Sequence, residues 1–224
     1  MITSKQVSDF KESFCNENKI IPKLLKDNFG LLVEDPILDV GSGLGDISSF
    51  AFENKEVIHL DVEDYSNYET PQKHTRVVKD FFEYKSKNQI DTLLLSHVLQ
   101  FIDGDIERLG EKIKEINPKH IIVVRNMNDD FMGKLMGWFD EQNIQSNPEK
   151  IITDFPVDYV GIKKVPFVAE LKCPNYEVLS EQVSYLWDVK LEGKQKAALK
   201  DFLKSNLPQP SFQINQEVIL YKKL

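Results

Sequence analysis

The segment Asp39-Val40-Gly41-Ser42-Gly43-Leu44-Gly45-Asp46 decides which fold this chain can form. Its three glycines stand between a short apolar strand predicted at residues 36–40 and a helix predicted at residues 46–52. Glycine lets the chain turn tightly and brings bare backbone close to a ligand, and the start of a helix directs free N–H groups outward. In an open α/β sheet, the crevice beyond the strand ends is the usual ligand site. The segment therefore predicts an α/β fold with a ligand site at residues 41–45.

The residues around this loop restrict the ligand. A dinucleotide fingerprint, G-x-G-x-x-G, would need a glycine where Asp46 stands, and an acid there would repel a pyrophosphate. No G-x-x-x-x-G-K-[ST] phosphate loop occurs in the sequence. Asp39, at the end of the first strand, suits a ligand with a positive group, and Asp61, at the end of the second predicted strand, can accept both hydroxyls of a ribose. The pattern predicts a site for a cationic nucleoside amino acid.

Short apolar runs alternate with helical patterns on both sides of the loop. Runs of this kind are typical of parallel strands that are buried on both faces, and the alternation predicts right-handed βαβ units. The fold class that we expect is therefore α/β, with a doubly wound, mainly parallel seven-stranded sheet and an antiparallel C-terminal strand. Further strands are expected at residues 57–61, 75–78, 91–96, 120–124, 160–171 and 216–221, and later helices at 177–186 and 194–203.

The chain shows no internal repeat, no low-complexity tract and no linker rich in Gly, Ser or Pro. Residues 4–29 have a helical pattern that Gly30 is suited to end. We therefore predict a single domain over residues 1–224, in which residues 1–34 form an N-terminal helical cover and residues 35–224 form the α/β core.

Composition and charge exclude several classes of protein. The 28 Lys and Arg residues against 36 Asp and Glu residues give a net charge of −8, which disfavours nucleic acid as a partner. No apolar run is long enough to cross a bilayer or to act as a secretion signal, so neither membrane insertion nor export is expected. The two cysteines, Cys15 and Cys173, form neither a zinc motif nor a disulfide framework. These observations predict a cytoplasmic protein without a metal site.

The loop and its flanking acids resemble motif I of the class I S-adenosylmethionine-dependent methyltransferases, whose fold is Rossmann-like. Asp61 resembles the ribose-binding acid of that family, and Asp80-Phe81 resembles the acid and apolar residue that hold the adenine. Residues 91–96 resemble the fourth strand, which opens the reaction pocket. The resemblance extends over residues 36–126, and it implies S-adenosyl-L-methionine as the cofactor.

The resemblance also implies roles for individual residues. The methionine part of the cofactor would be contacted by Asp39, Gly41 and Gly43. Asp61 would bind the ribose and Asp80 the amino group of the adenine, and Ser96 would line the floor under the sulfonium. Val62 would lie beside the adenine. The implied cofactor-binding residues are Asp39, Gly41, Ser42, Gly43, Asp61, Val62, Asp80, Phe81 and Ser96.

His97, directly after the fourth strand, is the candidate catalytic residue, because a neutral imidazole can accept a proton or orient a substrate. The alternative is a histidine that only shapes the loop. His59 and His120 are expected to be structural, and His74 is expected in an exposed loop. Arg125 follows the fifth strand and suits either a substrate carboxylate or a surface ion pair.

The predicted activity is transfer of a methyl group to nitrogen or oxygen of a small-molecule acceptor. Extra helices before the first strand and after the fifth suit a closed pocket, which favours a small acceptor. After Leu95 the sequence lacks the Asn/Asp-Pro-Pro-aromatic signature of amino-directed DNA methyltransferases. The alternatives are a protein methyltransferase, a methyltransferase-like nucleoside-binding module without catalysis, and a nicotinamide dehydrogenase, against which Asp46 argues.

Overall fold

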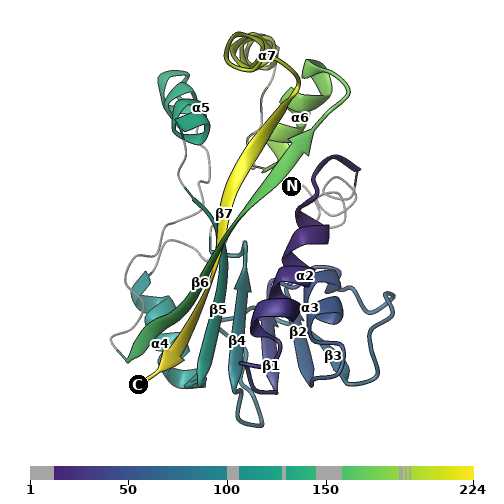
Figure 1. Ribbon diagram of the computed structural model, residues 1–224, viewed down its shortest axis with the longest axis vertical. Helices are drawn as coiled ribbons and strands as arrows, with labels where there is room; N and C mark the ends of the chain where they lie inside the picture. Colours follow the sequence, from purple (N-terminus) through teal and green to yellow (C-terminus); the bar gives the residue numbers. More distant parts are fainter. Residues whose placement is uncertain are drawn as a thin grey trace. The chain divides into compact units, whose positions relative to one another are not determined.

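The chain folds around one seven-stranded sheet in the computed structural model, which describes residues 13–99, 106–127, 130–144, 158–186, 189, 191 and 193–224. The strand order is β3-β2-β1-β4-β5-β7-β6, and β7 is antiparallel (Figure 1). This order confirms the predicted doubly wound α/β class with an antiparallel C-terminal strand. The strands are β1 (Ile37–Val40), β2 (Val57–Asp61), β3 (His74–Val78), β4 (Thr92–Ser96), β5 (His120–Asn126), β6 (Tyr159–Lys172) and β7 (Ser211–Lys223). The helices are α2 (Glu17–Phe29), α3 (Asp46–Ala51), α4 (Ile106–Ile116), α5 (Asp130–Glu141), α6 (Tyr176–Leu186) and α7 (Lys194–Asn206).

The first five strands are parallel, as their apolar runs predict. All four residues of β1 are buried, because the strand pairs with β2 on one side and β4 on the other and is covered on both faces. The register places Ile37 opposite Val57 of β2 and Thr92 of β4. All five parallel strands therefore end at the same edge of the sheet, and the glycine loop follows the end of β1 there.

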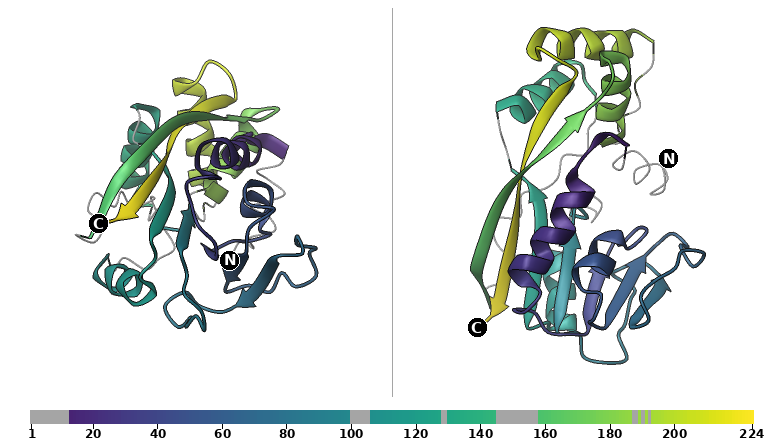
Figure 2. Two further views of the ribbon diagram at one scale, coloured as in Figure 1. Left: turned by 60° about the horizontal axis from the view of Figure 1, so that its bottom comes forward. Right: turned by 45° about the vertical axis from the view of Figure 1, so that its right-hand side comes forward.

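Side chains alternate between the two faces of these strands. Leu38, Leu60 and Leu93 point to one face, where they form a buried cluster with Leu109 and Ile113 of α4. Asp39 and His59 point to the opposite face, where Ser48 of α3 contacts both of them. Helices α3 and α4 therefore cover opposite faces of the sheet, and Figures 1 and 2 show α2 on the side of α3.

Helix α2 supplies the described part of the N-terminal cover; residues 1–12 of that prediction lie outside the described residues. Ile21, Leu25 and Phe29 are fully buried at helical spacing, which makes one apolar stripe. The helix begins at Glu17, and Cys15 before it forms an isolated β-bridge with Leu171, so the predicted helical pattern of residues 4–29 is interrupted there. It ends as predicted at Gly30, whose N–H donates to the carbonyl oxygens of Leu25 and Lys26.

Two compact units make up the chain. The first consists of Met1–Glu17, Asn126–Pro148 and Phe167–Gln216, and its core is formed by α5, α6 and α7 around fully buried residues such as Phe139 and Leu203. The second consists of Asn18–Arg125, Glu149–Pro166 and Glu217–Leu224, and it contains β1 to β4, α3 and α4. The single-domain prediction remains a prediction.

None of the helices in the described part of the chain has the length and hydropathy that crossing a bilayer requires.

Candidate functional site

The glycine loop is folded by its own hydrogen bonds and by neighbouring strands, all within the second unit. Gly41, Gly43 and Gly45 have φ angles of 65°, 54° and 79°, in the left-handed region that glycine adopts most readily. The N–H groups of Gly41 and Ser42 donate to the carbonyl oxygen of Leu60 at 2.8 and 3.2 Å. The Gly45 N–H donates to the Ser42 carbonyl oxygen at 2.8 Å. The loop therefore has a defined shape before any ligand binds.

The three glycines are required for different reasons. A Cβ at position 41 would lie 2.6 Å from Val98, and a Cβ at position 45 would lie 2.9 Å from the His59 ring. These two glycines allow close packing inside the protein. A Cβ at position 43 would have no described heavy atom within 4 Å. Gly43 is therefore the glycine of the loop that faces open space.

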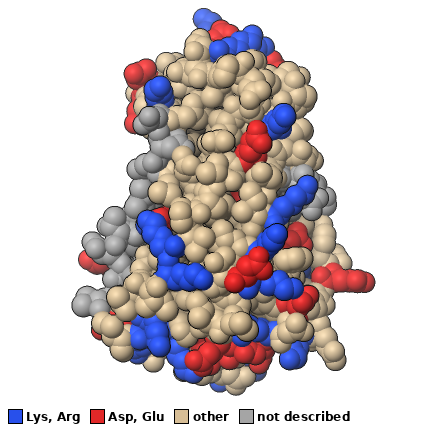
Figure 3. All heavy atoms as spheres, in the orientation of Figure 1, with Lys and Arg blue, Asp and Glu red and all other residues tan. Residues whose placement is uncertain are grey.

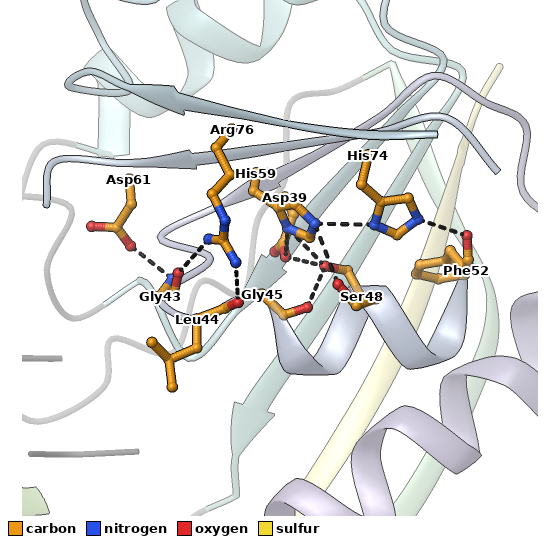
Figure 4. Close-up of polar contacts among 11 residues, drawn as sticks. Asp39, Gly43, Leu44, Gly45, Ser48, Phe52, His59, Asp61, His74 and Arg76 are labelled. Atoms are coloured by element: carbon orange, nitrogen blue, oxygen red, sulfur yellow. Dashed lines mark hydrogen bonds and ion pairs between the residues drawn. The ribbon is translucent and has the colours of Figure 1, made fainter. Parts of the chain in front are cut away.

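Asp61 is held at the end of β2 by two backbone donors. Its Oδ2 accepts the Gly43 N–H at 2.8 Å, and its Oδ1 accepts the Glu63 N–H at 3.0 Å (Figure 4). A carboxylate offers about four lone-pair directions, so both oxygens can accept a further hydrogen bond. The following residue, Val62, is 66% exposed and leaves an apolar surface beside the carboxylate.

Asp39 has its partners inside the protein. The residue is 3% exposed, its Oδ2 accepts the Ser48 hydroxyl at 2.5 Å, and the same oxygen lies 3.5 Å from His59 Nδ1. A buried carboxylate requires such partners, because an unpaired charge in the interior is costly. The structure therefore gives Asp39 a role beneath the loop, and its predicted contact with a positively charged ligand remains a prediction.

The expectation that His74 lies in an exposed loop is wrong. His74 is the first residue of β3, is buried, and has its Nε2 3.2 Å from the carbonyl oxygen of Phe52. Because a carbonyl can only accept, Nε2 carries a proton and donates it. Nδ1 of His74 lies 3.1 Å from Nε2 of His59, so a neutral His74 accepts a hydrogen bond there. The two histidines thus extend the buried network from Asp39 to Phe52, directly after the end of α3 (Figure 4).

This network predicts a pH dependence of stability. Burial lowers the pKa of His74 below its ordinary value, with a smaller lowering by His59, while the Phe52 carbonyl and Asp39 act in the opposite direction. The unfolded chain therefore binds more protons than the folded protein when the pH falls below about 6.5. We expect the stability contribution of His74 to be complete above that pH and to be lost as the pH falls towards the lower folded-state pKa, by at most about 1.4 kcal/mol per pH unit.

Urea unfolding at about pH 7.5 and about pH 5.5 measures this effect, with His74→Gln as the comparison. Burial lowers the pKa of His120 as well, so part of the acid loss should persist in the variant. A loss of the same size in both proteins would show that His74 does not cause it.

The Asp80-Phe81 pair lies just after β3. Asp80 is exposed, and its Oδ1 accepts the Phe82 N–H at 2.8 Å, as in a turn-capping aspartate. The Phe81 side chain is only 6% exposed and belongs to the core on the α4 face. Contact between Phe81 and a ligand would therefore have to come from its backbone.

Two serines of the predicted site carry hydroxyl groups without a protein partner among the described residues. These buried atoms are Ser42 Oγ, in the loop, and Ser96 Oγ, at the end of β4. Buried hydroxyls are nearly always hydrogen-bonded, to protein, water or ligand. His97 follows Ser96 with a φ angle of 50°, and its N–H donates to the Val124 carbonyl oxygen of β5 at 3.1 Å.

Arg125 forms an ion pair, but with a buried carboxylate and not at the surface as one of its two predicted roles had it. Its Nε and one terminal nitrogen lie 2.8 and 2.7 Å from Oε1 of Glu217, which is buried. Lys164 contacts the other oxygen of the same carboxylate. Arg125 therefore neutralises a carboxylate of this chain.

One polar face, shared by β1, β2 and β3, was not predicted from the sequence. Register pairs Asp39 with His59 and His59 with Arg76, so these side chains share that face. The available signal was the alternation of polar and apolar residues in His59-Leu60-Asp61, but only strand pairing shows that the polar positions of neighbouring strands meet.

Comparisons with known proteins bear on the fold. No family model and no curated protein matches this sequence. A candidate methyltransferase from Bacillus halodurans is 12% identical, with a TM-score of 0.61, and the match covers 90% of this chain and 98% of that one. A candidate type II methyltransferase from Anaeromyxobacter dehalogenans is 14% identical, with a TM-score of 0.56, over 90% of this chain and 95% of the other. Human N-acetylserotonin methyltransferase, solved in complex with S-adenosylmethionine, is 13% identical, with a TM-score of 0.50, over 98% of this chain and 54% of its own.

These matches and the strand order define the class of fold. The seven-stranded order with an antiparallel β7 is that of the class I S-adenosylmethionine-dependent methyltransferases. This chain has that fold, which confirms the resemblance derived from the glycine loop. At identities of 12–14% the likeness concerns the fold, and the activity must be argued from the site.

Proposed function

We propose that this protein is an S-adenosylmethionine-dependent methyltransferase that transfers a methyl group to nitrogen or oxygen of a small-molecule acceptor. The observation that carries the proposal is the arrangement at the ends of β1, β2 and β4. A preformed loop with an open glycine, a carboxylate fixed by two backbone donors and a buried serine hydroxyl without a described partner occur at one edge of the sheet.

The residues present fit such a cofactor. The open side of Gly43 leaves room for the amino-acid part, and the hydroxyls of Ser42 and Ser96 can bond polar atoms of a bound molecule. Asp61 can accept both ribose hydroxyls with its remaining lone pairs. The exposed Val62 offers an apolar surface for the adenine, and the second oxygen of Asp80 can accept from the adenine amino group. The roles of Gly41 and Phe81 would be limited to backbone contacts.

When bound, S-adenosylmethionine would supply a methyl group on a sulfonium for in-line transfer to the acceptor atom, with the thioether S-adenosylhomocysteine as the other product. The protein's task is to align that atom and to exclude water. A hydroxyl or ammonium acceptor must also lose a proton, and we assign its removal to His97, at the end of β4. The left-handed backbone at His97 is a conformation that asparagine also tolerates, so His97→Asn removes the imidazole with little backbone cost.

A small acceptor is supported by charge and by chain organisation. The net charge of −8 disfavours a nucleic acid, and acidic side chains lie among basic ones on the face shown in Figure 3. Among the described residues, helices α5, α6 and α7 follow β5 along the chain, and extra helices of this kind favour a small acceptor. We also propose that the protein is located in the cytoplasm, since no apolar run in this sequence is long enough to cross a bilayer.

The cofactor assignment is tested by Asp61→Ala. Loss of charged hydrogen bonds to the ribose should weaken binding of S-adenosylhomocysteine, the demethylated product, by about 1–3 kcal/mol, or roughly 5- to 150-fold in Kd. Isothermal titration calorimetry measures it. Asp64→Ala is the matched control, because Asp64 is an exposed acid nearby that accepts the Ser66 N–H. Equal affinities of wild type and Asp61→Ala would disprove the ribose assignment.

Turnover separates an enzyme from a binding module. We expect the wild-type protein to release S-adenosylhomocysteine from S-adenosylmethionine with some member of a panel of small amines and alcohols. His97→Asn should lower that rate by about 10²- to 10⁴-fold and leave cofactor affinity unchanged. An undiminished rate would show that His97 only shapes the loop, and binding without turnover on any acceptor would favour the non-catalytic module.

A further inference from the structure

Arg76 reaches from the middle of β3 to the glycine loop. One terminal nitrogen of its guanidinium donates to the carbonyl oxygen of Gly43 at 3.2 Å, and the other donates to the carbonyl oxygen of Leu44 at 2.5 Å (Figure 4). More than thirty positions separate these partners in sequence. A planar guanidinium is well suited to bond two neighbouring oxygens at once, which a single ammonium group cannot do in the same geometry.

The contacts of Arg76 complement those of Asp61. Asp61 accepts the N–H of Gly43, while Arg76 binds the carbonyl oxygen of the same residue. The peptide groups on both sides of Gly43 are therefore fixed by charged side chains from β2 and β3. Glycine has the greatest backbone freedom of any residue, so a left-handed Gly43 without these anchors would sample many conformations.

The surroundings of Arg76 keep its charge in place. Burial lowers the pKa of Arg76, and Asp46, Asp39 and Asp61 oppose that effect. The group remains protonated at neutral pH, because a guanidinium keeps its proton far above that pH. A fixed positive charge beneath the loop also offsets the repulsion among the carboxylates that gather there.

We propose that Arg76 is a positioning residue for the nucleoside pocket. It holds Gly43 and Leu44 in the conformation that receives the ligand. Arg76 does this through the loop carbonyls, so it is not a catalytic residue. The proposal rests on the proposed function for the identity of the ligand, but the hold of Arg76 on the loop is independent of it.

The first experiment measures the loop without ligand. Hydrogen exchange followed by mass spectrometry should show at least tenfold faster exchange of the amides in peptides spanning residues 41–46 in Arg76→Ala. Peptides from β4 should exchange as in the wild type, which distinguishes loosening of the loop from global unfolding. Arg108→Ala is the matched control, because Arg108 belongs to α4, which covers the opposite face of the sheet from α3, and its guanidinium lies over the Phe82 ring. Unchanged exchange in residues 41–46 of Arg76→Ala would overturn the proposal.

The second experiment links the loop to binding. Calorimetry with S-adenosylhomocysteine should give at least tenfold weaker binding in Arg76→Ala, a smaller loss in Arg76→Lys, and no change in Arg108→Ala. If Arg76→Ala does not fold, Arg76→Lys carries both experiments, with faster loop exchange and weaker binding still expected. A mobile loop with wild-type affinity would overturn the positioning role. No binding by the wild type would instead refute the cofactor assignment, while the exchange data would still decide whether Arg76 holds the loop.

Discussion

Asp39→Ala is expected to lower the free energy of unfolding by about 3–5 kcal/mol. The change removes a carboxylate that is 3% exposed and leaves the Ser48 hydroxyl without its acceptor and the His59 ring without its neighbouring carboxylate in the interior. Breaking one partner of a buried charged network is costly, because the remaining polar groups stay desolvated. Urea unfolding monitored by circular dichroism measures the difference.

Two further variants make this result interpretable. Asp39→Asn keeps an oxygen that can accept from Ser48, so we expect it to lose clearly less than the alanine variant. Glu53→Ala removes an exposed acid paired with Lys26 at 3.0 Å and should cost no more than about 1 kcal/mol. If Asp39→Asn weakens S-adenosylhomocysteine binding while leaving stability unchanged, the carboxylate acts on the ligand, as the sequence suggested, and not on the network beneath the loop.

The second large effect is expected at Gly45. A methyl group there would lie 2.9 Å from the His59 ring, at a φ angle of 79° that an L-residue adopts at a cost. Left-handed strain of about 1–2 kcal/mol and overpacking of about 1–3 kcal/mol predict that Gly45→Ala loses about 2–5 kcal/mol of stability. His59 is itself fixed by its neighbours in the network, so it cannot move away freely. The same unfolding experiment measures the loss.

Gly43→Ala and Gly110→Ala are matched controls for this prediction. Gly43 shares the positive φ but its Cβ would meet no described atom within 4 Å, so only the backbone strain of about 1–2 kcal/mol is expected. Gly110, within α4, also has open space, and alanine there should stabilise by about 0.5–1 kcal/mol. Equal losses at positions 43 and 45 would show that contact with His59 contributes nothing. If the open side of Gly43 receives the ligand, Gly43→Ala should nevertheless weaken S-adenosylhomocysteine binding.

Most of the fold could be predicted from the sequence because its strands are buried on both faces. Runs such as residues 92–95 have no polar residue beyond Thr92, and the glycine loop fixes which strand is the first. The last strand was predicted at residues 216–221, but it spans Ser211–Lys223. Its first half alternates buried Phe212 and Ile214 with polar residues, a weaker signal than a continuous apolar run.

The candidate site was predictable only where a residue's position along the chain fixes its place. Asp61 and Ser96 end their strands, so parallel pairing brings them to the loop edge. Arg76 and His74 could not be assigned in this way, because their contacts depend on the pairing of β3 with β2 and on the packing of α3. The buried state of Asp39 depends on the same tertiary contacts.

A crystal structure with S-adenosylhomocysteine tests the central claim most directly. We expect the product at the end of β1, with its amino-acid part against Gly43, its ribose hydroxyls on Asp61 and its sulfur near Ser96. The loop at residues 41–45 should keep the conformation described here, since its hydrogen bonds form without a ligand. A protein that stays ligand-free at saturating S-adenosylhomocysteine, or that binds it away from this loop, would contradict the assignment of the site.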